Sequence, residues 1–496
     1  MLTSRSYRAF LVMTLLVAPA TAGAQTNGYV LQCMSARAAG QGCVARARDD
    51  VPTDLFRDPA AIGWLTRPAL EVNVSPFMPQ LTFRNGANTA TVDGARHAYP
   101  LASIAWAGHR PSPRLAWGVG MEPIGGFGSD FTLRHALLGE GQRYESFFAA
   151  LKMGPAFAYE VTPRFSVGAS VYASYAQIRD FRMPFTMPPS AAAGMGAIMQ
   201  MDPHYPALFG QVTELTAYGD SHDFSGWAWG GSLGLAWRPN DAVRITASWT
   251  PRMTIALSGA TAVIDMNTQI QAMFGMMVQE RVQNHGMSPQ AAQGHVAQLL
   301  GQAGMNLQAG AKSTYRAATE LSEPQTVGAG LSLRLSDRWR LGLEGVWMDW
   351  SAAANVMPFR MTDGDNVNVN ILVNGNPAAA NFTYPFPLRW DDSFTGKGGV
   401  EFRATDQATL RAGYLYGNNP VPANTVFIAF PAISQQAATI GAGFDLGAVS
   451  LEGSLVRALN SRMTGTSGAH LLGNEYRNSA TTMSQWVFAL GAVWTY

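Results

Sequence analysis

The sequence predicts an all-β fold, a transmembrane antiparallel β-barrel of about 14 strands with an N-terminal hatch inside the lumen. Three observations predict it. Many segments alternate at period two between apolar residues and small or polar ones. Beyond residue 24 there is no apolar run long enough for a membrane helix. Finally, short and long connections between the alternating segments take turns along the chain.

Composition agrees with a lipid environment. Charged residues make up 14% of the chain, against roughly 25% in soluble domains. The formal net charge is +1, so nothing favours nucleic acid as a partner.

Residues 1–24 are expected to be a secretory signal peptide. Arg5 and Arg8 supply a basic start, residues 9–18 are apolar, and residues 22–24 (AGA) fit the small-residue cleavage rule. The alternative is a membrane anchor, but the apolar run is too short to span a bilayer.

Residues 25–68 do not alternate, and we expect them to plug the lumen as a hatch, because a barrel of about fourteen strands would otherwise leak. This segment holds the only two cysteines, Cys33 and Cys43. An exported protein enters a compartment that permits disulfides, so the two are a candidate disulfide. Two cysteines alone make no metal site.

The barrel is expected over residues 69–496. In residues 227–237 one face is rich in Trp and Leu and the other in Gly, Ala and Ser, and residues 339–347 and 484–496 behave alike. A β-sandwich core could also alternate, but Trp and Tyr near the ends of the apolar faces favour a lipid-facing wall. The terminal aromatic, Tyr496, is a candidate assembly signal for the barrel assembly machinery.

Six short turns and seven long loops join fourteen strands, and the even number places both chain ends on the short-turn, periplasmic side. The long loops are expected at 79–98, 125–145, 181–223, 258–322, 351–390, 417–435 and 457–481.

Two of these loops are unusual. Loop 181–223 is rich in methionine, including Met183 and Met187. Loop 258–322 is a helical insertion, in which Met273 and Met277 belong to an amphipathic stripe and Ser288-Pro289 starts a second helix. The loops either pack on each other or form an adaptable apolar surface for ligands.

The mature chain resembles the FadL/TodX family of outer-membrane transporters for long-chain fatty acids and other hydrophobic compounds. The segment from Gly28-Tyr29 to Asp58-Pro59-Ala60-Ala61 is similar to that family's hatch, with Asp58 where the family usually has Asn. Residues 121–131 (MEPIGGFGSDF) resemble its kinked third strand, and residues 321–351, 389–422 and 430–447 resemble its most typical stretches.

This resemblance implies passive uptake. A hydrophobic ligand is caught among the outer loops, passes the hatch at Asp58, Pro59 and Ala60, and leaves sideways through a gap in the wall made by the kinked strand. The ligand could be a fatty acid or an aromatic hydrocarbon. The partners expected are that ligand, outer-membrane lipid and the assembly machinery, with a monomeric barrel and no cofactor.

The gap is also reasonable from the residues alone. Pro123 removes a ladder donor, and Gly125 and Gly126 permit a bend. The alternative is that Pro123 only ends the strand at the rim.

A fatty-acid carboxylate inside the barrel would need a basic partner. Candidates are Arg389, Lys397 and Arg179. Each could instead pair with lumen acids such as Glu344 or Glu401.

The sequence gives little support for an enzyme. Gly230-x-Ser232-x-Gly234 matches a hydrolase elbow but lies on the small face of an alternating strand. The eight histidines (97, 109, 135, 204, 222, 285, 295 and 470) are expected in loops and turns without ligand spacing, so no metal site is predicted and an outer-membrane lipid hydrolase is disfavoured. A general diffusion porin remains an alternative, although the hatch and the apolar loops disagree with it.

Overall fold

The structure is a computed structural model that describes residues 26–48, 52–109, 112, 114–468 and 471–496. The predicted signal peptide lies outside the described residues. The wall is a closed antiparallel barrel of 14 strands, as the sequence predicted. Pairing of the last strand with the first, from Thr495 opposite Ala69 to Ala480 opposite Arg84, closes the ring.

Ten wall strands are continuous and four are interrupted. The continuous strands are β3 (Ala69–Arg84), β5 (Tyr99–His109), β6 (Leu115–His135), β7 (Gly139–Thr162), β8 (Phe165–Met187), β9 (Leu215–Asn240), β18 (Ala408–Gly417), β19 (Gln436–Asp445), β20 (Val449–Thr466) and β21 (Arg477–Thr495). The interrupted strands are β10 (Val243–Thr250) with β11 (Met253–Asp265), β12 (Lys312–Glu323) with β13 (Thr326–Arg334), β14 (Trp339–Met348) with β15 (Val356–Thr362), and β16 (Phe382–Pro387) with β17 (Ser393–Arg403). A two-residue strand, β4 (Val92–Asp93), pairs with β3, and a one-turn helix, α7 (Trp350–Ala353), fills one interruption.

The residues that alternate along each strand form an apolar outer surface and a packed interior. On β21, Leu490 is 69% exposed, whereas its neighbours Ala489 and Val487 are buried. On β9, Trp229 is 77% exposed. Exposed apolar side chains of this kind occur on strands around the whole ring, which is the surface expected of a wall in contact with lipid acyl chains.

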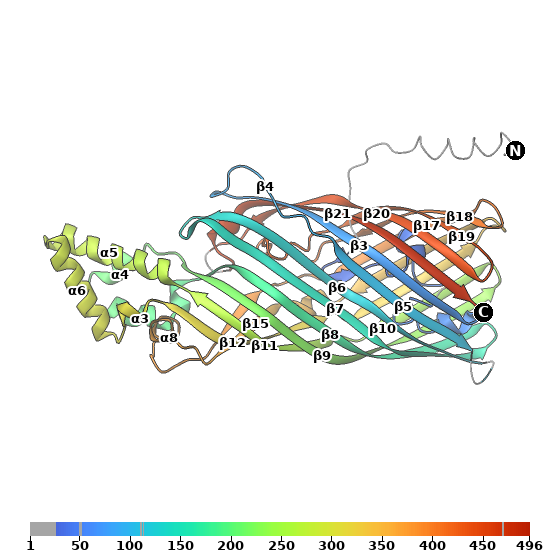
Figure 1. Cartoon of the computed structure of the whole chain (residues 1–496), viewed down its shortest axis with the longest axis horizontal. Helices are drawn as coiled ribbons and strands as arrows, with labels where there is room; N and C mark the ends of the chain where they lie inside the picture. Colours follow the sequence, from blue (N-terminus) through green and yellow to red (C-terminus); the bar gives the residue numbers. More distant parts are fainter. Residues whose placement is uncertain (1–25, 49–51, 110–111, 113, 469–470) are drawn as a thin grey trace.

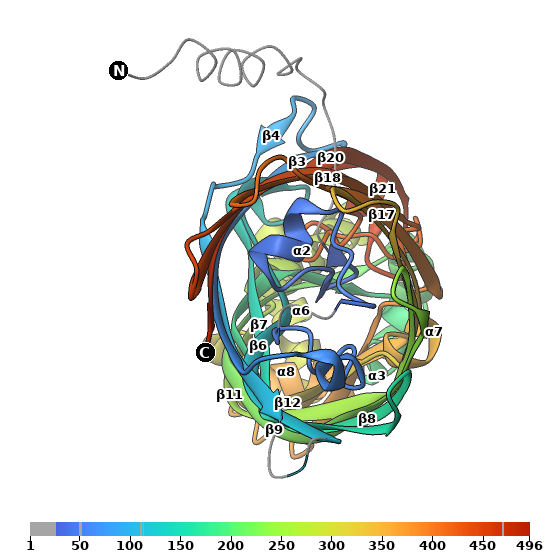
Figure 2. The ribbon, with the colours of Figure 1, turned by 90° about the vertical axis from the view of Figure 1, so that its right-hand side faces the viewer.

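The described residues of the N-terminal segment, 26–48 and 52–68, lie within the ring of strands (Figure 2). It forms β1 (Thr26–Asn27), β2 (Val30–Leu31), α2 (Ala36–Gly40) and the 3-10 turn η1 (Ala61–Trp64). A disulfide joins Cys33 to Cys43 across α2. Small inward residues of the wall let this segment approach closely. A Cβ at Gly441 would meet Gly40, for example.

Buried ion pairs hold the segment to the wall. The Glu344 carboxylate accepts hydrogen bonds from Arg46 Nη1 at 2.6 Å, Lys397 Nζ at 2.8 Å and the Ala45 backbone N–H at 2.8 Å. Farther along, Glu452 pairs with Arg37 and with Arg411. The small inward-facing residues that helped to identify the strands in the sequence also leave room inside the barrel for the N-terminal segment.

Helices gather at one end of the barrel, here called the helical end, and the C terminus lies at the other, here called the turn end (Figure 1). The helical end carries η2 (Pro189–Ala191), α3 (Ala193–Gln200), α4 (Tyr205–Phe209), α5 (Asn267–His285), α6 (Pro289–Gln302), η3 (Leu307–Ala309), α8 (Val367–Asn374) and η4 (Asn474–Tyr476). The Ser288 side chain caps α6 by accepting from Ala291 N–H, as its position predicted. None of the helices described is long and apolar enough to cross a bilayer.

Several loop boundaries predicted from the sequence are wrong. The expected loop 125–145 is a three-residue turn between β6 and β7, because both strands continue toward the helical end. The expected loops 181–223 and 258–322 shrink to 188–214 and 266–311. The added strand segments carry charged pairs on their outer faces, such as Arg143 with Asp130 at 3.1 Å. The apolar alternation is lost in these segments because the outer face of that part of the wall is not apolar.

Candidate functional site

The wall has one place where two neighbouring strands separate beside the N-terminal segment. The ladder between β5 and β6 runs from His109–Ala116 to Ile104–Met121 and ends there. Just beyond, the pairing of β6 with β7 shifts by one residue at Ile124, which is a β-bulge directly after Pro123. β5 continues to Tyr99 beside β3, so its edge toward β6 is unpaired over that stretch.

The N-terminal segment inserts at this bulge. Val30 of β2 pairs with Gly125, and Gly126 N–H donates to the Tyr29 carbonyl at 3.2 Å. A Cβ at Gly125 would lie only 1.8 Å from that carbonyl oxygen. Glycine at 125 is therefore required by the close approach of two backbones, in addition to any role in bending the strand.

A cavity of about 200 Å³ occupies the separated region, and we call it the wall cavity. It is bounded by β3, β5, β6 and β7 and by Leu31 of the N-terminal segment. Its lining is apolar: Leu31, Phe77, Tyr99, Pro100, Leu101, Gly125, Gly126, Phe127, Phe147, Phe148 and Ala149.

A second cavity, the interior cavity, adjoins the first. The two share Phe77, Gly126 and Phe127 in their linings. The interior cavity also contacts Phe430 and Met483. The rings of Phe127 and Phe430 stack with centroids 3.5 Å apart, so an aromatic pair stands where the two cavities meet.

A third cavity, the outer cavity, lies at the helical end. Its lining is Phe185, Met187, Ala217, Gly219, Ser221, Ile264, Met266, Phe359, Met361, Val373, Phe382 and Tyr384. Aromatic contacts lead from it toward the interior cavity: Tyr384 to Phe386 at 6.2 Å, Phe386 to Phe427 at 4.8 Å, and Phe427 to Phe430 at 6.4 Å. Among the described residues, none of the three cavity linings contains a charged side chain.

The predicted basic residues do not converge on these cavities. Arg389 is exposed, between the buried Leu388 and Trp390, and lines none of the three cavities. Lys397 is buried and engaged with Glu344 and with the Gln32 carbonyl at 3.1 Å, which is the alternative the sequence left open. Arg179 points outward, pairs with Asp180 and lies 4.2 Å above the ring of Phe147 at the rim of the wall cavity.

The four predicted methionines fall into two groups. Met187 lines the outer cavity, together with Met266, which precedes α5. Met183, Met273 and Met277 are buried in side-chain packing and line none of the three cavities. Packing of the loops on each other thus accounts for most of the stripe.

Residues Asp58, Pro59 and Ala60 pack on the wall away from the wall cavity. The Ser166 hydroxyl donates to the Ala60 carbonyl at 3.1 Å, and a Cβ at Gly168 would meet the Pro59–Ala60 backbone. Ser232, the candidate hydrolase serine, is buried and donates to the Phe56 carbonyl at 2.7 Å. It is thus a contact to the N-terminal segment.

Three expectations about histidine are wrong. His222 lies within β9, where Asp180 contacts its Nδ1 at 3.2 Å, and His109 and His135 are the last residues of β5 and β6. Sequence reasoning also missed Phe127 and Phe430, since single aromatic residues in a predicted loop carry no signal of partnership. Tyr496 is exposed directly after β21, and its assembly role stays a prediction.

The sequence matches the family described as "Outer membrane protein transport protein (OMPP1/FadL/TodX)" over residues 17–492. The chain belongs to the FadL/TodX family. Members of this family are outer-membrane transport channels for hydrophobic compounds and are not enzymes. This membership therefore makes the chain an outer-membrane transport protein. No curated protein sequence matches the chain.

Solved structures agree in fold. A Pseudomonas aeruginosa FadL homologue superimposes with a TM-score of 0.67 at 15% identity, covering 94% of this chain and 99% of that chain. The Pseudomonas putida toluene transporter TodX gives 0.65 at 15% identity, covering 95% and 100%. CymD, described as a monoaromatic hydrocarbon channel, gives 0.59 at 14% identity, covering 94% and 98%.

Proposed function

We propose that this chain takes up small neutral hydrophobic compounds, of the aromatic hydrocarbon class, by passive diffusion from the outer cavity to the wall cavity. The helical end faces outward, and both chain ends face the periplasm. Residues 25–68 act as the hatch. The ligand leaves sideways through the separation of β5 from β6 into the membrane.

The observation that carries the proposal is the apolar character of all three cavities. A neutral aromatic molecule gains from burial against aromatic rings and needs no charged partner. A carboxylate left without a partner in the same lining would pay a large desolvation cost. The buried cations Arg46 and Lys397 pair with Glu344, and neither lines any of the three cavities.

The relatives support the class. TodX is described as a toluene transporter and CymD as a monoaromatic hydrocarbon channel, and both share the fold of this chain.

Long-chain fatty acids are the second candidate, and Arg179 favours them. Its guanidinium lies over Phe147, which lines the wall cavity, so a carboxylate held at the rim would meet a cation. In that case the acyl chain would lie inside and the headgroup outside the wall.

The experiment is a binding comparison on the purified barrel with toluene, oleate and a small sugar, using wild type and Arg179→Ala. The proposal predicts toluene binding that is unchanged by ionic strength and by the substitution. Oleate binding that weakens with salt and in Arg179→Ala would favour the second candidate. Conduction of the sugar without binding of either apolar ligand would contradict both.

A further inference from the structure

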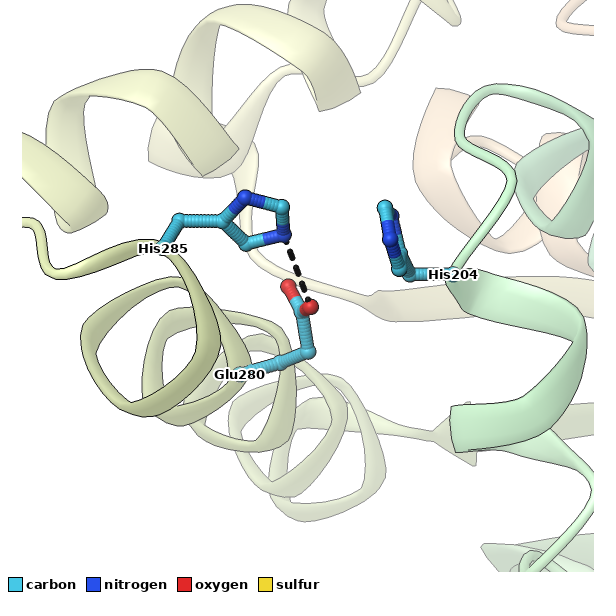
Figure 3. A group of neighbouring side chains, drawn as sticks. All are labelled: His204, Glu280 and His285. Atoms are coloured by element: carbon cyan, nitrogen blue, oxygen red, sulfur yellow. Dashed lines mark hydrogen bonds and ion pairs between the residues drawn. The ribbon is translucent and has the colours of Figure 1, made fainter.

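We propose that His204, Glu280 and His285 form a zinc site that clamps the segment before α4 to the end of α5. One potential ligand atom from each of the three lies within 4.8 Å of the other two. Figure 3 shows the two imidazole rings and the carboxylate turned toward a common point. Two imidazoles and one carboxylate form a donor set that suits Zn²⁺ and leaves a fourth position for water.

The spacing of the donors fits a tetrahedral ion. Ligand atoms about 2.0–2.1 Å from a tetrahedral zinc are separated from each other by roughly 3.3 Å. His285 Nε2 lies 3.1 Å from Glu280 Oε1, close to that separation without rearrangement. The His204 ring approaches edge-on to the His285 ring, with centroids 4.9 Å apart. Because the three ligand atoms lie within 4.8 Å of one another, they must draw together by at most about 1.5 Å to reach the tetrahedral spacing.

His204 is oriented by a carboxylate. Its Nδ1 contacts Asp202 Oδ1 at 2.9 Å, which leaves Nε2 as the nitrogen available to a metal. Metal-binding histidines usually donate their other ring N–H to a carboxylate or carbonyl, because this fixes the tautomer and ring direction. Asp202 is thus suited to a supporting role.

Glu280 is the strongest single indication. Its side chain is 95% buried, and Oε2 makes no hydrogen bond in the structure. A buried carboxylate oxygen without a hydrogen bond is costly, and a bound cation would satisfy it.

Arg281 is the group that competes with a metal, and its charge is largely used. It pairs with Asp202 and lies 5.3 Å above the Tyr205 ring. Its Nη1 also lies 3.3 Å from His285 Nε2, so zinc binding requires this guanidinium group to turn away from His285. Its Nε is 3.3 Å from Glu280 Oε2 without hydrogen-bond geometry. With two carboxylates and one guanidinium, the group keeps one negative charge in excess when both imidazoles are neutral, which favours a divalent cation.

The clamp would join two helical-end segments that each follow a residue of the outer cavity. Met187 lines the cavity and precedes the segment that contains His204, and Met266 lines it and precedes α5. Zinc would therefore restrict the relative movement of the two insertions that follow these methionines. This consequence rests on the proposed function, whereas zinc binding itself does not.

The test is zinc titration of the full mature barrel in detergent, without a histidine tag, with Co²⁺ absorption to report coordination. We expect one zinc per chain, and affinity reduced by more than about tenfold in His204→Ala, His285→Ala and Glu280→Gln. His295→Ala is the matched control, because His295 belongs to α6 of the same insertion and lies outside the cluster. Wild-type affinity in the three variants, or equal loss in His295→Ala, would overturn the site.

Hydrogen exchange separates the clamp from binding alone. In wild type, zinc should slow exchange of backbone amides in 204–209 and in the last turn of α5, and His204→Ala should abolish the effect. Zinc binding without slower exchange in either segment would refute the clamp. Both readouts are independent of transport, so they stand or fall apart from the proposed uptake of hydrocarbons.

Discussion

The rings of Phe127 and Phe430 stack at a centroid distance of 3.5 Å, and Phe127 borders both the interior cavity and the wall cavity. The pair therefore stands where the two cavities of the proposed path meet. Phe430 also contacts Phe427, the last ring of the aromatic series that starts at the outer cavity.

Phe127→Ala should join the two cavities and raise the uptake rate of bulky aromatics such as naphthalene several-fold. Phe430→Ala should act in the same direction, and the double variant should add little, since one contact is removed either way. Rates are measured in cells that express equal amounts of folded barrel. Phe157→Ala, at an exposed position on β7, is the control. Slower uptake in Phe127→Ala would argue against a barrier there.

Glu344→Ala should loosen the N-terminal segment inside the barrel. The substitution leaves Arg46 and Lys397 buried without their shared carboxylate, at a cost of about 3–5 kcal/mol. Hydrogen exchange of amides in residues 41–48 should become faster. Glu320→Ala removes an exposed pair with Arg360 and serves as the control. Unchanged protection in Glu344→Ala would show that the ion pairs do not hold the segment.

Gly125→Ala should displace the hatch from the bulge, because its Cβ would overlap the Tyr29 carbonyl. We expect a lower thermal unfolding midpoint and loss of the protection of Val30 in hydrogen exchange. Gly453→Ala, where the nearest atom is 3.9 Å away, is the matched strand control. A variant as stable as the control would mean that the Tyr29–Gly125 approach is easily relaxed.

Glu475 predicts a pH dependence at the helical end. Burial raises its pKa from 4.5 to about 8, against the hydrogen bond donated by Tyr144 at 2.6 Å. The folded state thus retains a proton that the unfolded state loses above pH 4.5, and stability should fall as pH rises from 4.5 to about 8. Each unit costs at most about 1.4 kcal/mol. Thermal unfolding midpoints measured across this range should flatten in Glu475→Gln, and an equal slope in both proteins would contradict the assignment.

The sequence was sufficient for the barrel because lipid imposes a period-two pattern on every spanning strand. It was sufficient for the six short turns as well. The prediction failed where the strands extend beyond the lipid. There β6 and β7 continue past the apolar band, and their charged outward residues give a sequence that resembles a loop.

The residues of the candidate site were harder to predict from the sequence than the barrel. Pro123, Gly125 and Gly126 were predicted to lie at an irregularity of the strand because each has a local backbone reason, and the structure has a β-bulge there. The exposure of Arg389 was not predictable from the sequence. Arg389 lies in the interruption between β16 and β17 with a φ of +51°, so the strand alternation does not continue through it. His204 and Glu280 meet only through the packing of two helical-end segments, a contact that no spacing in the sequence encodes.

The central claim is that ligand leaves through the wall cavity, and filling that cavity tests it most directly. Ala149→Trp places an indole in a space of about 200 Å³. Ala247→Trp, on the exposed face of β10, adds the same side chain to the wall elsewhere. The measurement is uptake of labelled toluene by cells with equal amounts of folded barrel. We expect a loss of about tenfold or more in Ala149→Trp alone, because a blocked cavity no longer admits the ligand. Wild-type uptake in Ala149→Trp would contradict a lateral exit between β5 and β6.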